Sequence, residues 1–178
     1  MGPRYALARR KAAELLQEVN VDVPPVPVEK LAELSGAVIR YEPFEGQMSG
    51  VLYNAGDVDG AVIGINALHP SVRQRFSIAH EVGHLLLHAD TELQVDKHAF
   101  VAFRNLASST ADDPMEVEAN QFAAALLMPE DLLSRCVNEL DDDLDLEVAI
   151  ARLAQRFGVS EQAMTIRLTS LRWITGTR

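Results

Sequence analysis

Apolar side chains recur at steps of three and four residues in several stretches of the chain, which is the period of an amphipathic helix. These stretches predict helices at residues 4–19, 28–35, 71–88, 114–128, 129–139, 146–157 and 161–173. Gly158 and Ser160, between the last two stretches, are typical of a helix end and of a helix start. The second half of the chain is therefore predicted to be mostly helical.

Runs rich in Val, Ile and Tyr predict strands at residues 37–41, 50–53 and 61–65. The Gly- and Asp-rich residues 54–60 between the last two runs predict a hairpin turn. We therefore expect a small antiparallel sheet ahead of the helix at 71–88, in a fold of the α+β class. Residues 90–111, which contain Phe100, Val101 and Phe103, are compatible with a strand or with a docked loop.

Three prolines at positions 24, 25 and 27 enforce an extended connection after the first helix. We expect three parts: a helix and linker at residues 1–27, a core at 28–140, and a helical pair at 141–178 that packs on the core. The pair, with Gly158 and Ser160 at its turn, also has the spacing of a helix-turn-helix.

Charge and composition narrow the classes of function. The formal net charge of −10 excludes non-specific binding of the whole surface to nucleic acid or to an anionic membrane. Charge is uneven, since the segment after residue 145 carries five Arg against two Glu while the rest of the chain is net negative. The single Cys136 cannot form an internal disulfide, and the sequence shows neither a signal-peptide core nor an apolar run of membrane length. These features predict a cytoplasmic protein.

The helix predicted at 71–88 carries the pattern HExxH, with His80, Glu81 and His84. Residues four apart lie on the same face of a helix, so the two imidazoles can bind one zinc ion. Glu81 lies about 100° around the helix, where its carboxylate can reach a water held by the metal and act as a general base. The alternative is that the pattern arises by chance and that the two histidines are ordinary side chains of a half-buried helix. We expect the histidine face to open to a cleft bordered by a strand from residues 50–65.

A catalytic zinc needs a third protein ligand. Asp90 and Leu87 stand where one known pattern has a third His and a helix-breaking Gly, which excludes that class. A carboxylate from the helix at 114–128 remains, and Glu116 and Glu118 are both available. The small residues in line with Glu116 favour it, because they allow close packing at Gly83. The alternative role of Glu116 is structural, because Asp113 and Glu116 have the spacing of a capping box at the start of the helix.

Two segments together, RFSIAHEVGHLLLH at residues 75–88 and EVEANQFAAALLMP at 116–129, resemble the ImmA/IrrE family of zinc metallopeptidases. The resemblance covers roughly residues 28–171. It implies a zincin-like fold, with a small sheet beside the HExxH helix. It also implies zinc on His80, His84 and Glu116, with Glu81 as the general base; another divalent ion is an alternative. Since seven residues follow Leu171, we expect a short form without a sensor domain.

The resemblance also implies a substrate, namely a helix-turn-helix transcriptional repressor encoded nearby. Its cleavage would relieve repression of mobile-element, phage, stress or toxin–antitoxin genes. The alternative is a non-catalytic regulatory or DNA-binding module that uses the C-terminal helix pair. Direct binding to nucleic acid is not favoured, because the pair carries few Arg for a phosphate track.

Several residues around the motif have secondary roles to consider. His88 either complements the dipole at the end of its helix or contacts a metal ligand or the substrate. His98 is a candidate for stabilising a tetrahedral intermediate. Asn120 is a candidate for orienting a metal ligand through a hydrogen bond. Arg167 and Arg172 are expected to be solvated.

Overall fold

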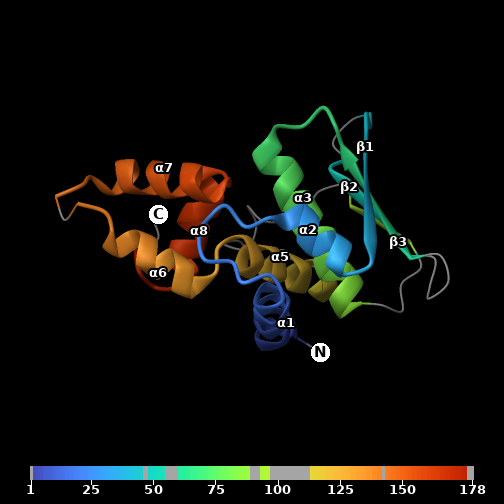
Figure 1. Cartoon of the computed structure of the whole chain (residues 1–178), viewed down its shortest axis with the longest axis horizontal. Coiled ribbons are helices and arrows are strands. Elements are labelled where there is room, and N and C mark those ends of the chain that lie inside the picture. Colours follow the sequence, from blue (N-terminus) through green and yellow to red (C-terminus); the bar gives the residue numbers. More distant parts are fainter. Residues whose placement is uncertain are drawn as a thin grey trace.

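Helix α3 (Ser71–Leu87) lies between a small sheet on one side and a second long helix, α5 (Pro114–Leu127), on the other (Figure 1). This computed structural model describes residues 2–45, 48–54, 60–88, 93–96, 113–141 and 143–175. The fold is of the α+β class, as the sequence predicted.

The predicted helices are present with small differences at their ends. Besides α3 and α5, the described residues form α1 (Tyr5–Gln17), α2 (Val28–Leu34), α6 (Glu130–Asn138), α7 (Leu146–Phe157) and α8 (Glu161–Ser170). The carboxylate of Asp113 accepts from the Met115 amide and begins α5, while the Ser160 hydroxyl accepts from the Ala163 amide and begins α8. Gly158 ends α7 with a φ of +64°, which a residue without Cβ adopts readily.

The sheet has four strands in the order β1-β3-β2-β4, with β1 at Ala37–Glu42, β2 at Gly50–Asn54, β3 at Ala61–Asn66 and β4 at Leu93–Asp96. β2 is antiparallel to β3, as expected, and also to β4. β1 is parallel to β3, so the prediction of a wholly antiparallel sheet was wrong. The reason lies in the strand order: β1 pairs with β3 rather than with β2, its neighbour in sequence, and the largely buried β3 takes the inner position between them. Phe100, Val101 and Phe103 lie outside the described residues.

The two long helices meet where α3 has a glycine. A Cβ added at Gly83 would lie 3.1 Å from Phe122 Cδ1 and 3.2 Å from both Cα and O of Ala119. The absence of a side chain therefore lets the backbones of α3 and α5 approach each other. Phe76, Ile78, Ala79 and Val82 are buried in the same region, and these contacts form the centre of the core.

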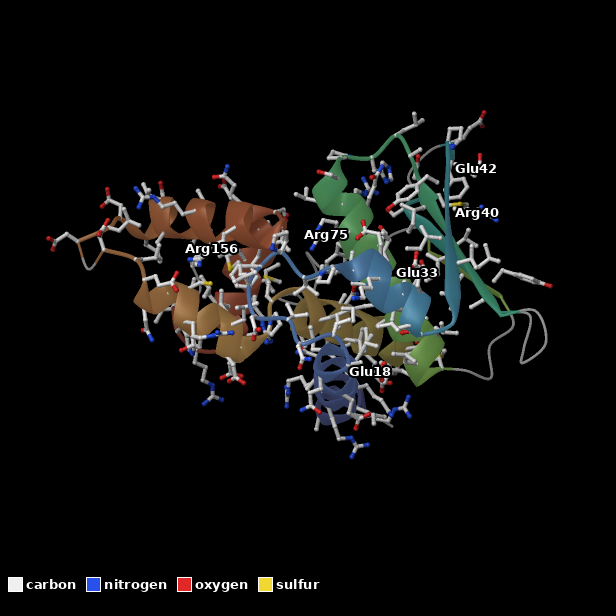
Figure 2. The ribbon with its side chains drawn as sticks, in the orientation of Figure 1. Glu18, Glu33, Arg40, Glu42, Arg75 and Arg156 are labelled. Atoms are coloured by element: carbon white, nitrogen blue, oxygen red, sulfur yellow. The ribbon has the colours of Figure 1, made fainter. Side chains whose placement is uncertain are left out.

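The beginning of α3 is tied to two distant parts of the chain. Arg75 Nη2 donates to the Val26 carbonyl at 2.7 Å, and Nε donates to the Gly158 carbonyl at 3.2 Å. Figure 2 shows Arg75 between α3 and the C-terminal helices. One guanidinium thus joins the N-terminal linker and the α7–α8 turn to the helix that carries HExxH.

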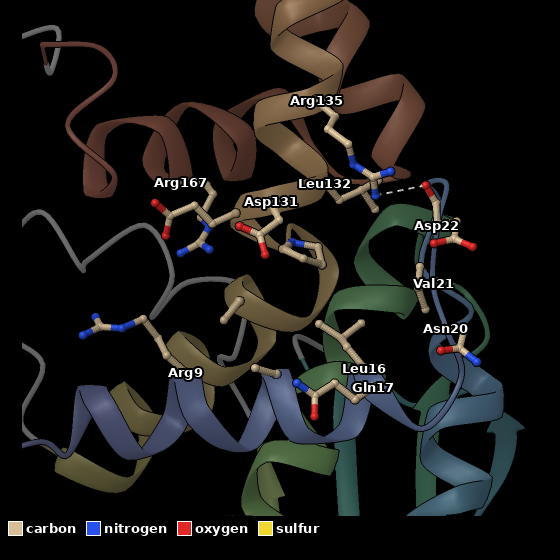
Figure 3. A pocket seen from close by; sticks show the side chains of 14 residues that line it. Arg9, Leu16, Gln17, Asn20, Val21, Asp22, Asp131, Leu132, Arg135 and Arg167 are labelled. Atoms are coloured by element: carbon tan, nitrogen blue, oxygen red, sulfur yellow. Dashed lines mark hydrogen bonds between the residues drawn. The ribbon is translucent and has the colours of Figure 1, made fainter.

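Arg167 on α8 is buried, which corrects the expectation that it is solvated. It lies on the side of α8 that also buries Ala163, Met164 and Leu168, and Nε donates to the Met128 carbonyl at 3.0 Å. Arg167 also lines a cavity of about 500 Å³ between α1, α6 and α8 (Figure 3). No helix in the described part of the chain combines the length and apolar character needed to cross a membrane.

Candidate metal centre

His80 and His84 lie one turn apart on the face of α3 that packs toward α5. Their Nε2 atoms are 3.0 Å apart, and both residues are fully buried. The rings meet edge to face with centroids 4.6 Å apart. The helical period that the sequence predicted therefore directs both imidazoles to one point.

Helix α5 brings Glu116 to the same point. Its Oε2 lies 3.3 Å from His80 Nε2, and its Oε1 lies 3.1 Å from His84 Nε2. Asp113 caps α5 by accepting from the Met115 amide. Glu116 lies in the first turn of α5, and its carboxylate contacts the two histidines. These three residues form a group that could hold a metal ion, with one donor atom from each and all donors within 4.8 Å of one another.

The donor set fits a divalent ion on geometry. Zinc bonds to His nitrogen and carboxylate oxygen are about 2.0–2.2 Å long, so neighbouring ligands of a tetrahedral site lie roughly 3.3 Å apart. The observed separations between the two imidazoles and Glu116 are 3.0, 3.1 and 3.3 Å. Two imidazoles and one carboxylate also match the His₂Glu set of catalytic zinc sites.

Hydrogen bonding leads to the same conclusion. Asn120 Oδ1 lies 3.0 Å from His80 Nδ1 and accepts its proton, so Nε2 of a neutral His80 carries a lone pair. That lone pair faces a carboxylate oxygen of Glu116, which also only accepts, so a proton or a metal ion has to lie between the two atoms. Asn120 thus lies where the sequence expected it, against a candidate ligand.

Electrostatics favour a metal ion over a proton at this point. Burial lowers the pKa of His84 to about 4, so its imidazole is neutral at physiological pH. A neutral imidazole is the protonation state that a metal ligand needs.

Glu81 is fully buried against the first residue of β2. A Cβ at Gly50 would lie 2.8 Å from Glu81 Oε1, so the strand backbone lies directly beside the carboxylate. The expected strand from residues 50–65 is therefore next to the motif. The histidine face is not open as expected: His80, Glu81 and His84 are all buried, and the Glu116 side chain, 29 % exposed, is the part of the centre that solvent reaches.

The remaining predicted residues have different outcomes. Glu118, considered as a third ligand, points elsewhere: it is buried and contacts Arg4 and His88. His88 follows the last residue of α3 and contacts both His84 and Glu118. His98 lies outside the described residues. Sequence reasoning missed Arg4 because no motif connects it to a site more than 70 positions away.

Comparisons with known proteins identify relatives of this chain. A family model described as the IrrE N-terminal-like domain, of the peptidase M78 family, matches residues 32–169. A radiation response metalloprotease, IrrE of Deinococcus deserti, is 33 % identical over 161 residues, or 89 % of this chain and 53 % of that protein. IrrE of Deinococcus radiodurans is 32 % identical over 139 residues, or 78 % of this chain and 38 % of that protein. The chain thus spans about half the length of these relatives, or less.

A solved structure described as a Mycobacterium tuberculosis transcriptional regulator shares the fold. It aligns with a TM-score of 0.57 at 18 % identity, over 91 % of this chain and 46 % of that one.

Proposed function

We propose, since this chain belongs to the peptidase M78 family of IrrE N-terminal-like domains, that it is a zinc-dependent endopeptidase. Its proposed substrate is a helix-turn-helix transcriptional repressor, cut at one or a few bonds so that repression is relieved in the cytoplasm. The observation that carries the proposal is the convergence of His80, His84 and Glu116, with donor atoms within 4.8 Å of one another.

The metal-binding role falls to three side chains. His80 and His84 would each contribute Nε2, and Glu116 would contribute a carboxylate oxygen. A zinc ion held there supplies a Lewis acid that polarises the scissile carbonyl and lowers the pKa of water. Another divalent ion with similar ligand preferences is the alternative.

Glu81 is proposed as the general base. Glu81 follows His80 directly on α3, and its burial against Gly50 limits the freedom of its carboxylate to move. The carboxylate would take a proton from the attacking water and pass it to the leaving amine nitrogen. Asn120, bonded to His80 Nδ1, would hold the imidazole so that Nε2 stays available.

The class of substrate rests on the resemblance of the two motifs and on charge. A net charge of −10 attracts a basic DNA-binding partner and disfavours acidic ones. The buried Arg167 reduces the positive charge that α8 could offer to DNA, so a protein substrate is preferred over nucleic acid.

The test is incubation of the zinc-loaded protein with the helix-turn-helix protein encoded beside it, followed by mass spectrometry. The parent should cut at one or a few sites, and a chelator should stop it. Glu81→Gln should lose about 10²–10⁴-fold in rate while retaining zinc, and Glu116→Ala should lose zinc itself. Glu161→Gln, at an exposed position on α8, is the matched control and should behave as the parent.

Two outcomes would contradict the proposal. If Glu81→Gln cuts as fast as the parent, Glu81 is not the base. If well-metallated parent protein binds the repressor but never cuts it, the protein is a regulatory binding module.

A further inference from the structure

A continuous line of polar contacts leads from the N-terminal segment to the metal centre. Arg4, the residue before α1, meets Glu118 on α5: Nη2 and Nε donate to Oε2 at 2.7 and 3.0 Å, and the backbone N donates to Oε1 at 2.7 Å. Glu118 Oε2 lies 3.0 Å from His88 Nε2. His88 Nδ1 lies 3.2 Å from His84 Nδ1. His84 then presents Nε2 to His80 and Glu116.

We propose that Arg4, Glu118 and His88 are positioning residues that hold His84 in the tautomer and orientation required of a metal ligand. The inference rests on the proposed function, because it assigns a role toward the metal that His80, His84 and Glu116 would bind.

The Glu118 carboxylate can only accept, and with a neutral His88 this sets the direction of the hydrogen bonds that follow. The Glu118 carboxylate, held by the Arg4 guanidinium, accepts from His88 Nε2–H. Nδ1 of a neutral His88 then carries a lone pair and accepts from His84 Nδ1–H. His84 is left with its lone pair on Nε2, the atom that faces Glu116 at 3.1 Å.

Burial makes this chain effective. The side chains of Glu118 and His88 are each 4 % exposed, so water offers them little competing hydrogen bonding. Arg4 Nη2 also donates to the Leu87 carbonyl at 3.3 Å, which is at the end of α3. Arg4 therefore joins α5, through Glu118, to the last turn of α3, and the two helices carrying the proposed ligands are held together.

The two histidines are thus supported in different ways. An amide oxygen, from Asn120, accepts the Nδ1 proton of His80, while His84 depends on a histidine backed by a carboxylate. A carboxylate behind a ligating histidine raises its basicity and fixes its ring. The His84 side of the centre is therefore the side that the N-terminal segment influences.

The experiment measures zinc affinity by competition with a chelator. His88→Leu and Glu118→Gln should weaken zinc binding about 10–100-fold, the usual effect of removing such support. Arg4→Ala should act in the same direction, and Arg4→Lys should recover part of the loss. Arg10→Ala removes an exposed arginine of α1 and is the matched control, with an unchanged affinity expected.

A conservative variant and a spectroscopic readout separate positioning from folding. His88→Asn keeps an acceptor opposite His84 Nδ1, so it should bind zinc more tightly than His88→Leu. In nitrogen-detected NMR of the zinc-loaded parent, the His84 ring should show a proton on Nδ1 that is protected from exchange, and His88→Leu should remove that protection.

The outcomes distinguish this inference from the proposed function. If the parent binds zinc and cuts the repressor while folded His88→Leu and Glu118→Gln bind zinc as the parent does, the positioning role is refuted. The role is also refuted if these variants lose thermal stability but the folded protein keeps its zinc affinity. If the parent itself binds no zinc, the proposed function fails first.

Discussion

The close approach of α3 and α5 at Gly83 gives a prediction whose magnitude can be worked out. In Gly83→Ala the new Cβ would lie 3.2 Å from two backbone atoms of Ala119 and 3.1 Å from the Phe122 ring. The ring can rotate, but the Ala119 backbone cannot, so α5 has to move by a few tenths of an ångström. Glu116 lies one turn before Ala119 and moves with it.

Two opposing effects set the change in stability. Alanine is favoured over glycine inside a helix by about 1 kcal/mol, whereas overpacking costs about 1–3 kcal/mol. The metal-free variant should therefore lose up to about 2 kcal/mol, since the contact with backbone puts the overpacking cost above its lower limit. For a protein of this size the loss corresponds to a fall in Tm of up to about 8 °C.

Metal binding should be more sensitive than stability. Metal–ligand distances are set to within about 0.2 Å, which is comparable to the expected displacement of Glu116. We expect Gly83→Ala to bind zinc at least about tenfold more weakly, as other changes that displace ligands do. Thermal unfolding monitored by circular dichroism, with and without zinc, measures both effects.

A control isolates the intrinsic preference for alanine. Ala13 is an exposed interior residue of α1, and Ala13→Gly measures the cost of glycine in a helix without overpacking. If Gly83→Ala raises Tm by the amount that Ala13→Gly lowers it, and zinc affinity is unchanged, then α3 and α5 do not pack at Gly83 in the way described.

Three further predictions concern the same centre. Gly50→Ala would place a Cβ 2.8 Å from Glu81 Oε1, so repressor cleavage should fall by at least about tenfold while zinc affinity is kept. Unchanged cleavage would show that the position of the Glu81 carboxylate does not depend on β2. Zinc at 100 times its Kd should stabilise the protein by about 2.7 kcal/mol, or roughly 5–11 °C in Tm. An equal Tm with zinc and with chelator would contradict metal binding by His80, His84 and Glu116. Hydrogen bonds from Arg4 lower the pKa of Glu118 to about 2. The contribution of Glu118 to stability is therefore complete above about pH 5 and is lost as the pH falls toward 2. Urea titrations of metal-free protein between these pH values should show a smaller loss of unfolding free energy for Glu118→Gln than for the parent.

The parts of the fold that the sequence predicted are those encoded by neighbouring residues. Helical period places His80 and His84 on one face, and Gly158 and Ser160 mark the α7–α8 turn through local backbone and capping preferences. The choice of Glu116 depended on the resemblance of the two motifs and on one longer argument, namely that small residues on α5 and Gly83 on α3 allow the helices to touch. The structure brings these residues together.

The parts that could not be predicted depend on distant partners. β1 pairs with β3, which is separated from it in sequence by β2, and no local pattern specifies that pairing. The contact of Arg4 with Glu118 has no sequence signature, and an isolated helical Glu is usually exposed. The burial of Arg167 had a sequence signal, because Arg167 follows Met164 by three positions on an apolar helix face. Its charge nevertheless led to the prediction that it is exposed to solvent.

The contact between Arg4 and Glu118 spans 114 positions, and this has a consequence for biosynthesis. At about 5–20 residues per second, a ribosome needs roughly 6–23 s to add those positions. During that interval α3 can form with both histidines, but the carboxylates of α5 have not yet been made. His84 precedes Glu116 by 32 positions, so a nascent chain offers two ligands roughly 2–6 s before it offers three. Tight loading of metal has to wait until α5 leaves the ribosome. Chains that stall before residue 116 would leave the ribosome without a complete site.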